Sequence, residues 1–219
     1  MAFLDISPRR YGSADVFQYS NCGKRLFDVI LCLALIPLAV PLIAMLWVIS
    51  TANGNRGFYA HPRVGRHGKT FNCLKIRTME PAADAIFNNA LEVNAEFAHE
   101  WRHSQKLKND PRVLRFGRFL RATSMDELPQ IWNVFRGDMS FVGPRPVTLG
   151  ELSRYGDAAN DYLSLRPGIT GLWQVSGRGK VSFKHRVRLD LQYIHNISMF
   201  GDLVLLFRTI AAVFRATGQ

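Results

Sequence analysis

The sequence has few cysteines and few acidic residues, and both shortages narrow what the protein can be. Its three cysteines, Cys22, Cys32 and Cys73, are odd in number and show neither CxxC nor Cys/His metal-ligand spacing. A disulfide framework or a zinc site is therefore not expected, which favours a reducing, cytoplasm-facing protein. Only 17 acidic residues oppose 28 lysines and arginines, giving a formal charge of +11. That charge calls for an anionic partner, which could be nucleic acid, an anionic membrane surface or a phosphorylated substrate.

Familiar nucleotide-handling motifs are also missing. The segment RVGRHGKT, Arg63 to Thr70, ends like a Walker A loop, but Arg63 stands where the first glycine belongs and the segment enters an apparent strand. Neither the G-x-G-x-x-G fingerprint nor the G-x-S-x-G elbow occurs. Any nucleotide must therefore be held by arginines, lysines and glycine turns. No nucleic-acid-binding motif is recognised either, so no nucleic-acid partner is expected.

A long apolar run lies near the N-terminus. From Val29 to Ile49 the chain has 21 residues without a charge, which as a helix at about 1.5 Å per residue would just cross a hydrocarbon core of about 30 Å. A cleaved signal peptide is disfavoured because the run is long, lacks a small-residue cleavage site and starts too far into the chain. The run is interpreted as a membrane segment, with the core helix of a soluble domain as the alternative.

Prolines and flanking charges bear on how this segment meets the membrane. Pro37 and Pro41 remove two helical amides near its middle, so the helix should kink or break there. Basic residues lie at both ends: Lys24 and Arg25 before the run, and Arg56, Arg63, Arg66 and Lys69 after it. The positive-inside rule then assigns both ends to the cytoplasm. A re-entrant helix-break-helix over residues 21–52 satisfies both observations, and a spanning helix is the alternative.

The remaining chain predicts an α+β fold that is mostly helical with a small β-hairpin. Residues 1–20 are interpreted as a flexible basic tail, and residues 53–219 as one compact domain. The hairpin is expected between Gly57 and Met79, around Gly65 and Gly68. Helices are expected at Ala82–Leu107, Pro129–Arg136, Thr148–Leu165, Ser182–His195 and Asp202–Arg215. The last is apolar nearly all round, which suits burial or a place at the membrane interface.

The segment from Arg121 to Pro146 carries the strongest indication of chemistry. It places two adjacent carboxylates, Asp126 and Glu127, among arginines, which include Arg121, Arg136 and Arg145. Such a pair can hold a divalent cation, and one member can attack an electrophile, while the arginines neutralise phosphates. The alternative is a capping box from Ser124 to Glu127. Pro129 complicates that interpretation, because a helix beginning at Met125 would lack its amide, so the carboxylates could instead precede a helix that begins near Pro129. Either arrangement favours an ionised Asp126.

Several cations are candidates for binding phosphate. Lys75 and Arg77 alternate with apolar residues in an apparent strand and would share one face, either as a solvated surface or as a phosphate clamp. Arg145 lies between two prolines, which hold its guanidinium at low entropic cost. Two arginine-glycine turns follow, at Arg166-Pro167-Gly168 and Ser176-Gly177-Arg178. Preorganised arginines of this kind suit a diphosphate.

Taken together, these segments resemble the bacterial sugar transferase family, the monotopic polyprenyl-phosphate phosphoglycosyl transferases. The segments are Lys24-Arg25 with Asp28, the proline-interrupted apolar run, KIRTM at Lys75 to Met79, TSMDELPQIWNVFRGDMSFVGPRP, and RPGITGLWQVSGR at Arg166 to Arg178. The resemblance covers roughly residues 21–215 and is strongest to the short, succinoglycan-type enzymes that initiate exopolysaccharides. The sequence departs from the family in having Val40 where many members have a serine before the proline.

The resemblance implies an activity and roles for particular residues. Such enzymes transfer a sugar 1-phosphate from a UDP-sugar to undecaprenyl phosphate at the cytoplasmic face of the bacterial inner membrane, release UMP, and use Mg²⁺. Asp126 would be the nucleophile and Glu127 its assistant, both as metal ligands, and residues 53–219 would be the catalytic domain. The substrate-binding residues would be Lys75, Arg77, Arg121, Arg145 and Arg178.

Some questions stay open at this level. The sugar is expected to be galactose or glucose, with an N-acetylated amino sugar as the alternative. A basic membrane scaffold without activity is the rival class, and it leaves the Asp126-Glu127 pair without a role. The oligomeric state is open, a homodimer being one arrangement that the sequence allows.

Overall fold

The structure is a computed structural model that describes residues 19–52, 56–104, 107, 109–177 and 182–214. It is mostly helical, as predicted, and has two small sheets. The longer helices are α2 (Lys24–Ala52), α3 (Ala83–Val93), α4 (Ala95–Ser104), α5 (Arg115–Thr123), α6 (Gln130–Arg136), α10 (Phe183–His195) and α11 (Met199–Phe214). The shorter helical segments are η1 (Tyr19–Gly23), η2 (Arg66–Gly68), η3 (Met125–Glu127), α7 (Leu149–Leu152), η4 (Ser153–Ala158), α8 (Ala159–Ser164) and α9 (Leu172–Gly177). The strands are β1 (Phe58–Val64), β2 (Thr70–Ile76), β3 (Ser140–Val142) and β4 (Gly168–Thr170).

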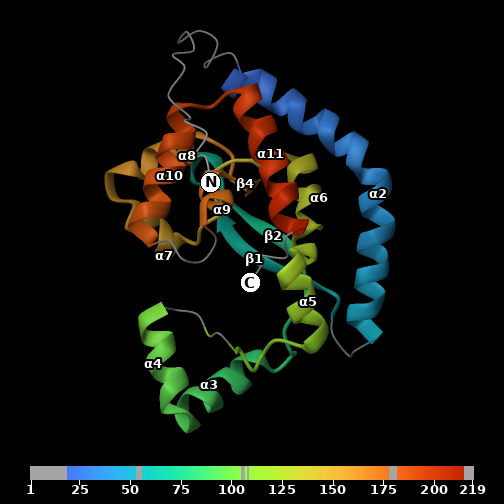
Figure 1. Ribbon diagram of the computed structural model, residues 1–219, viewed down its shortest axis with the longest axis vertical. Coiled ribbons are helices and arrows are strands. Elements are labelled where there is room, and N and C mark those ends of the chain that lie inside the picture. Colours follow the sequence, from blue (N-terminus) through green and yellow to red (C-terminus); the bar gives the residue numbers. More distant parts are fainter. Residues whose placement is uncertain (1–18, 53–55, 105–106, 108, 178–181, 215–219) are drawn as a thin grey trace.

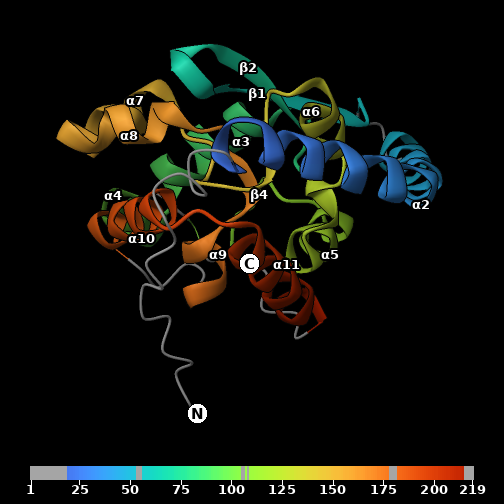
Figure 2. The same ribbon diagram turned by 90° about the horizontal axis from the view of Figure 1, so that it is seen from above.

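The predicted hairpin is confirmed. Strands β1 and β2 are antiparallel, with Phe58 opposite Ile76 and Val64 opposite Thr70. The second sheet, a parallel pair of β3 and β4, was not predicted. Its strands approach so closely that a Cβ on Gly168 would lie 2.1 Å from the backbone nitrogen of Gly143, so glycine is required there. Figure 2 places the hairpin and α11 on opposite sides of the molecule.

Helix α2 is continuous where the sequence predicts a break. Pro37 and Pro41 both lie inside it, and Figure 1 shows α2 bending near its middle along the rim of the molecule. Each proline removes one amide donor, and a helix accommodates that loss by bending when the turns on either side are otherwise intact. Helix-break-helix is therefore wrong as a description of the backbone. The re-entrant topology stays a prediction, and among the described residues α2 is the one helix long and apolar enough to cross a membrane.

Buried polar contacts fasten the N-terminal half of α2 to the rest of the chain. The Asp28 carboxylate accepts hydrogen bonds of 3.0 Å from the Ser140 hydroxyl and from the Phe141 amide. Lys24 Nζ lies 2.5 Å from Asp202 Oδ2 on α11. Arg25 donates to two carbonyls at the C-terminal end of α6, where cations are favoured by the helix dipole. Lys24 and Arg25, which were interpreted as membrane-flanking charges, thus join the helix to α11 and α6, and Asp28 joins it to β3.

Two of the predicted long helices are divided in the structure. The segment predicted as Ala82–Leu107 forms α3 and α4, because Asn94 leaves the helical conformation and its side-chain oxygen accepts the Glu96 and Phe97 amides. The segment predicted as Thr148–Leu165 forms α7, η4 and α8, interrupted at Gly156, which has a φ of 56°. Helix α10 begins one residue after the predicted Ser182, which is its N-cap. Helix α11 begins one turn before the predicted Asp202.

Candidate active site

The two candidate catalytic acids lie in one short turn between two helices. Helix α5 ends at Thr123, and Ser124 adopts a left-handed conformation with a φ of 59° as its C-cap. The predicted capping box is therefore wrong, because Ser124 closes α5 and its side chain makes no cap hydrogen bond to η3. Asp126 and Glu127 occupy η3, and α6 follows Pro129. The alternative in which the carboxylates precede the helix is confirmed.

Apolar neighbours fix the orientation of this turn. Met125 and Leu128 flank the two acids and pack against a buried cluster of Leu46, Ile76 and Leu120. These three residues come from α2, β2 and α5, so the turn is held where three elements meet. Asp126 is only 7% exposed as a result. Burial of a carboxylate is costly unless charge or hydrogen bonds compensate it, so this position is unusual for a surface-type residue.

Two of the predicted cations do lie beside the acids. Lys75 Nζ is 2.7 Å from Glu127 Oε1 and 3.8 Å from Asp126 Oδ2. Arg121 lies close enough for its charge to act on Asp126, and its Nε donates to the Thr78 hydroxyl at 2.9 Å. Each cation therefore has a fixed position that faces the same carboxylate. A phosphate placed next to Asp126 would meet both of them.

Asp126 was expected to be ionised, but its pKa is raised rather than lowered. Burial raises its pKa to about 6; Lys75 opposes this, Glu127 raises the pKa further, and Arg121 lowers it. The expectation that arginines and a helix end would favour ionisation did not account for this burial. At pH 7 the carboxylate is still mostly ionised, and it is more basic than an ordinary aspartate. That combination suits a nucleophile.

The other predicted binding residues lie elsewhere or outside the described residues. The Arg77 guanidinium is 5.4 Å from the centre of the Tyr59 ring. Arg166, in the first arginine-glycine turn, donates to the Gly137 carbonyl and so connects β4 to the end of α6. Arg178 lies outside the described residues. The structure therefore brings Lys75 and Arg121 to the acids, while the placement of Arg77 and Arg178 in a site stays a prediction.

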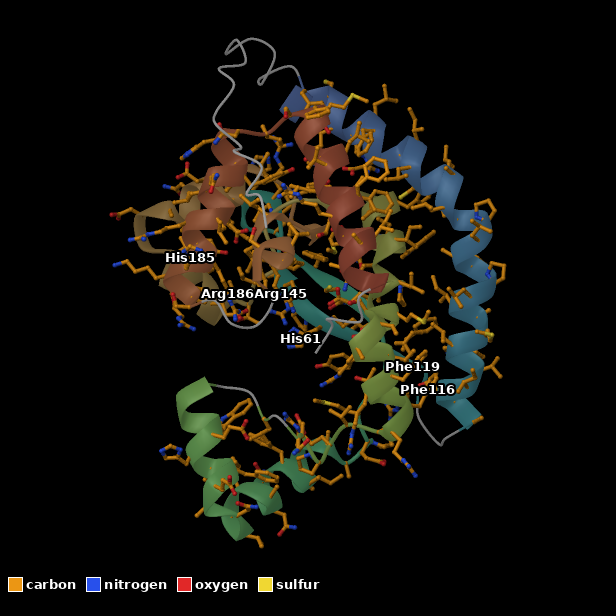
Figure 3. The ribbon with its side chains drawn as sticks, viewed as in Figure 1. His61, Phe116, Phe119, Arg145, His185 and Arg186 are labelled. Atoms are coloured by element: carbon orange, nitrogen blue, oxygen red, sulfur yellow. The ribbon has the colours of Figure 1, made fainter. Side chains whose placement is uncertain are left out.

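Arg145 belongs to a second cluster that the sequence did not reveal. Its guanidinium is 5.6 Å from the centre of the Trp173 ring, and Arg186 lies 4.7 Å from the same ring (Figure 3). Asp190 is buried one helical turn after Arg186. The spacing of Arg186 and Asp190 on one face of a predicted helix was the only available signal. Trp173 lies between the two arginine-glycine turns, and no sequence pattern marked it as part of a cluster.

The carboxylates can be tested against the metal that the resemblance implies. Magnesium usually takes one or two protein carboxylates and completes its coordination with water and substrate phosphates. Asp126 and Glu127 fit that donor set, although no group of three histidine, cysteine or acidic side chains suited to a metal occurs in the described part of the chain. Residues His99 to His103 read HEWRH, an H-E-x-x-H pattern on α4. The side chains of residues 102–104 lie outside the described part of the structure, so the pattern carries no argument for a metal site.

Comparisons with known proteins identify the family of the chain. Residues 19–216 match the family model described as bacterial sugar transferase. The exopolysaccharide production protein ExoY of Rhizobium meliloti is 46% identical over 90% of this chain and 88% of its own length. The undecaprenyl-phosphate galactose phosphotransferase of Salmonella typhimurium is 45% identical over 89% of this chain and 41% of its own. The UDP-glucose:undecaprenyl-phosphate glucose-1-phosphate transferase of Xanthomonas campestris is 35% identical over 93% and 41%. The chain thus spans about two fifths of several curated relatives.

Proposed function

The chain belongs to the bacterial sugar transferase family, and on that basis we propose that it transfers a sugar 1-phosphate from a UDP-sugar to undecaprenyl phosphate, releasing UMP. The proposal depends on one observation: the Asp126 carboxylate is buried, has a raised pKa, and lies within range of the charges of Lys75 and Arg121. Phosphoryl transfer depends mainly on positioning and charge neutralisation, and this turn supplies both. The names of relatives that act on undecaprenyl phosphate support the same chemistry.

In the first half of the reaction Asp126 is the nucleophile. Its carboxylate oxygen attacks the phosphorus that bears the sugar, and the bond from that phosphorus to the bridging oxygen breaks. The electron pair leaves with UMP, and the sugar phosphate stays on Asp126 as an acyl phosphate. Lys75 and Arg121 neutralise the charge that develops on the phosphoryl oxygens.

In the second half the lipid phosphate replaces Asp126. An oxygen of undecaprenyl phosphate attacks the same phosphorus, the bond to the Asp126 carboxylate breaks, and the product is a polyprenyl diphosphate sugar. One small site can serve two anionic substrates in this way because they occupy it in turn. Glu127 is held by Lys75 at 2.7 Å, which positions it to hold a metal or to accept a proton from the incoming phosphate.

Magnesium is proposed as the cofactor. Asp126 and Glu127 would hold it together with the substrate phosphates, and it would supply charge neutralisation at the diphosphate. Removal of Mg²⁺ by EDTA should stop UMP release, and adding excess Mg²⁺ should restore it. Full activity in EDTA would contradict this assignment.

The location is proposed to be the cytoplasmic face of the bacterial inner membrane. Apolar side chains on α2 lie uncovered in the structure, among them Leu26, Ile30, Leu33, Leu38, Val40 and Val48. On α11, Phe207 and Ile210 are also exposed, which supports the expectation of an interfacial helix. A re-entrant α2 would keep Asp126 near the depth of a lipid phosphate.

Thiol labelling tests that topology. Cysteines placed singly at Ser20 and Asn55, in a chain with Cys22→Ser, should both react with a membrane-impermeant reagent applied from the cytoplasmic side. Protection of one site but not the other would show a spanning helix and overturn the re-entrant topology.

The sugar is proposed to be galactose or glucose, since relatives named for each are similar to this chain. The test is UMP release from a panel of UDP-sugars with undecaprenyl phosphate and Mg²⁺. UDP-galactose or UDP-glucose should be the preferred donor, and Asp126→Asn should abolish release. Preference for a UDP-linked N-acetylated amino sugar would show that the proposed sugar is wrong. Unchanged release by Asp126→Asn would contradict the proposed mechanism.

A further inference from the structure

Arg77 lies where the hairpin meets the C-terminal end of α2. Its amide donates a hydrogen bond of 2.8 Å to the carbonyl of Gly57, just before β1. Its carbonyl accepts one of 3.2 Å from the Ser50 hydroxyl on α2. A Cβ on Gly57 would lie 2.3 Å from the Trp47 ring, so the start of the hairpin is packed against the same helix. The backbone of Arg77 is therefore fixed between α2 and β1.

The Arg77 side chain has no ion-pair partner in the described part of the chain. Its guanidinium lies 5.4 Å from the centre of the Tyr59 ring, a distance typical of a cation–π contact. Its Nε is buried and has no hydrogen-bond partner among the described residues, and the ion pairs found there do not include it. Buried donors are nearly always paired in native proteins, and those of charged groups pair most strongly. A bound anion would supply the acceptor that this donor lacks.

Tyr59 connects Arg77 to the catalytic turn. It lies directly opposite Lys75 in the register of β1 and β2, and the side chains of such a pair share one face of the hairpin. Lys75 Nζ is 2.7 Å from Glu127 Oε1 and 3.8 Å from Asp126 Oδ2. Arg77 follows Lys75 by two residues and contacts the Tyr59 ring, so it projects to the same face. The two cations are spaced by about 7 Å, at about 3.3 Å per residue, which lets each face a different phosphate group.

The surroundings of Arg77 favour the phosphate of a lipid. Trp47 of α2 and Phe58 of β1 stack with their ring centres 6.4 Å apart, and Trp47, Phe58 and Tyr59 are each 40 to 42% exposed. Tryptophan and tyrosine are enriched where a membrane meets water, at the level of the lipid headgroups. Among the described residues α2 is the one helix long and apolar enough to cross a membrane. We therefore expect an anion that reaches Arg77 along this end of α2 to be a lipid headgroup.

We propose that Arg77 binds the phosphate of the lipid acceptor, and that Tyr59 is the positioning residue that holds its guanidinium toward the catalytic face of the hairpin. The inference rests on the proposed function and deepens it, because it assigns the two substrates to different cations. Lys75 and Arg121 serve the phosphorus that becomes attached to Asp126. Arg77 serves the phosphate that later replaces Asp126, and its planar guanidinium can donate two parallel hydrogen bonds to that group.

The kinetics of the two half-reactions test this assignment. With a covalent intermediate, kcat/KM for the UDP-sugar reports the first half and kcat/KM for undecaprenyl phosphate reports the second. UMP release by the full chain in detergent is the measurement. Arg77→Gln should lower kcat/KM for undecaprenyl phosphate about 10- to 100-fold, the value of a hydrogen bond to a charged group. Its kcat/KM for the UDP-sugar should stay within about twofold of the wild type, and Arg77→Lys should give intermediate values for the lipid.

Variants of Tyr59 separate a positioning role from a structural one. Tyr59→Leu removes the ring and leaves Arg77 in place, so it should lower kcat/KM for undecaprenyl phosphate about 2- to 10-fold, the value of a cation–π contact. Tyr59→Phe keeps the ring and should behave like the wild type. A fall of both kcat/KM values together in Tyr59→Leu would show a structural role and overturn the positioning role.

Arg56→Gln is the matched control for charge. Arg56 is exposed and lies one residue before Gly57, at the same end of α2. Its removal should leave both kcat/KM values unchanged. A loss for undecaprenyl phosphate as large as that of Arg77→Gln would show general attraction of an anionic lipid to a basic surface, and would overturn a specific site at Arg77.

Direct binding separates the inference from its premise. Farnesyl phosphate, a short polyprenyl phosphate, should bind Arg77→Gln more weakly than the wild type in isothermal titration calorimetry, whereas farnesol, which lacks the phosphate, should bind both proteins equally. Thermal unfolding checks that each variant is folded, and Arg77→Lys and Tyr59→Leu supply the same test if Arg77→Gln does not fold.

Three results would contradict the account at different points. An unchanged kcat/KM for undecaprenyl phosphate in folded Arg77→Gln would overturn the inference and leave the proposed function standing. A loss confined to the UDP-sugar would assign Arg77 to the nucleotide and would also overturn it. A wild-type protein that binds farnesyl phosphate but releases no UMP from any UDP-sugar would contradict the proposed function itself.

Discussion

Asp202 and Asp126 are both buried acids that face a lysine, yet their surroundings differ. Asp202 accepts hydrogen bonds from Lys24, Tyr19 and Tyr193, so both of its oxygens are used. Within the described residues Asp126 accepts no hydrogen bond from another side chain, and its lysine is 3.8 Å away. A carboxylate that is fully bonded stabilises the fold, whereas one held buried with spare acceptor capacity is available to react. The difference separates the anchor of α2 from the candidate nucleophile.

Removing the fully bonded acid should have the largest effect on stability. Asp202→Asn leaves Lys24 buried without its counter-charge, which should destabilise the protein by about 3 to 5 kcal/mol. Chemical denaturation in detergent measures this change. UMP release per folded molecule should persist, since Asp202 lies outside the catalytic turn. A loss of stability below about 1 kcal/mol would show that the two acids are not as different as their contacts indicate.

Removing Asp126, which accepts fewer hydrogen bonds, should stabilise the protein instead of destabilising it. The pKa of Asp126 is raised in the folded state to about 6, so its contribution to stability is present below the unfolded pKa near 4 and is lost as the pH rises through 6. At pH 7.5 Asp126→Asn should therefore be more stable than the wild type by about 3 kcal/mol, at about 1.4 kcal/mol per pKa unit. The same measurement at pH 5 should show a smaller gain. Destabilisation at pH 7.5 would contradict the view that fold stability is given up for function here.

Lys75 offers a way to change Asp126 without removing it. Lys75 lowers the pKa of Asp126, so Lys75→Met should raise it by the order of one unit. Because the attacking form is the carboxylate, the acid limb of the rate of UMP release should move to higher pH. Lys69→Met, an exposed position at the hairpin turn, is the control. A reduced rate with an unmoved acid limb would assign Lys75 to phosphate binding alone.

The smallest effect on stability is expected at an exposed ion pair. Arg136 Nε lies 3.6 Å from Asp138 on the surface, where such pairs contribute little. Arg136→Gln should change the free energy of unfolding by less than about 0.5 kcal/mol. The same should hold for UMP release, which would remove Arg136 from the candidate phosphate-binding arginines. A tenfold loss of activity in Arg136→Gln would show instead that Arg136 takes part in phosphate binding.

The two buried acids also show what the sequence could and could not predict. Asp126 was identifiable because the acids, the arginines and Pro129 lie within one short segment. Asp202 was not, because its partners Lys24 and Tyr193 come from distant positions and meet only in the folded chain. The same limit applies to β3 and β4, strands of three residues that are parallel and lie far apart in sequence. Arg186 and Trp173 were missed for this reason as well.

Local sequence patterns gave wrong predictions where a residue caps a different helix from the one to which it was assigned. Ser124 matched the start of a capping box but closes α5, a helix that was not predicted. Asn94 looked like an interior helix residue, but its side chain caps α4. The prolines of α2 were expected to kink or break a helix that is continuous in the structure. In each case packing or capping decided between conformations that the local sequence allowed.

The central claim is that Asp126 carries the sugar phosphate, and intact-protein mass spectrometry tests it most directly. The protein is incubated with UDP-galactose or UDP-glucose and Mg²⁺ in the absence of undecaprenyl phosphate. The account predicts release of UMP together with a sugar phosphate bound to the peptide that contains Asp126, lost when undecaprenyl phosphate is added and absent in Asp126→Asn. Release of UMP only when the lipid is present, with no adduct formed beforehand, would show direct transfer between the substrates and would contradict it.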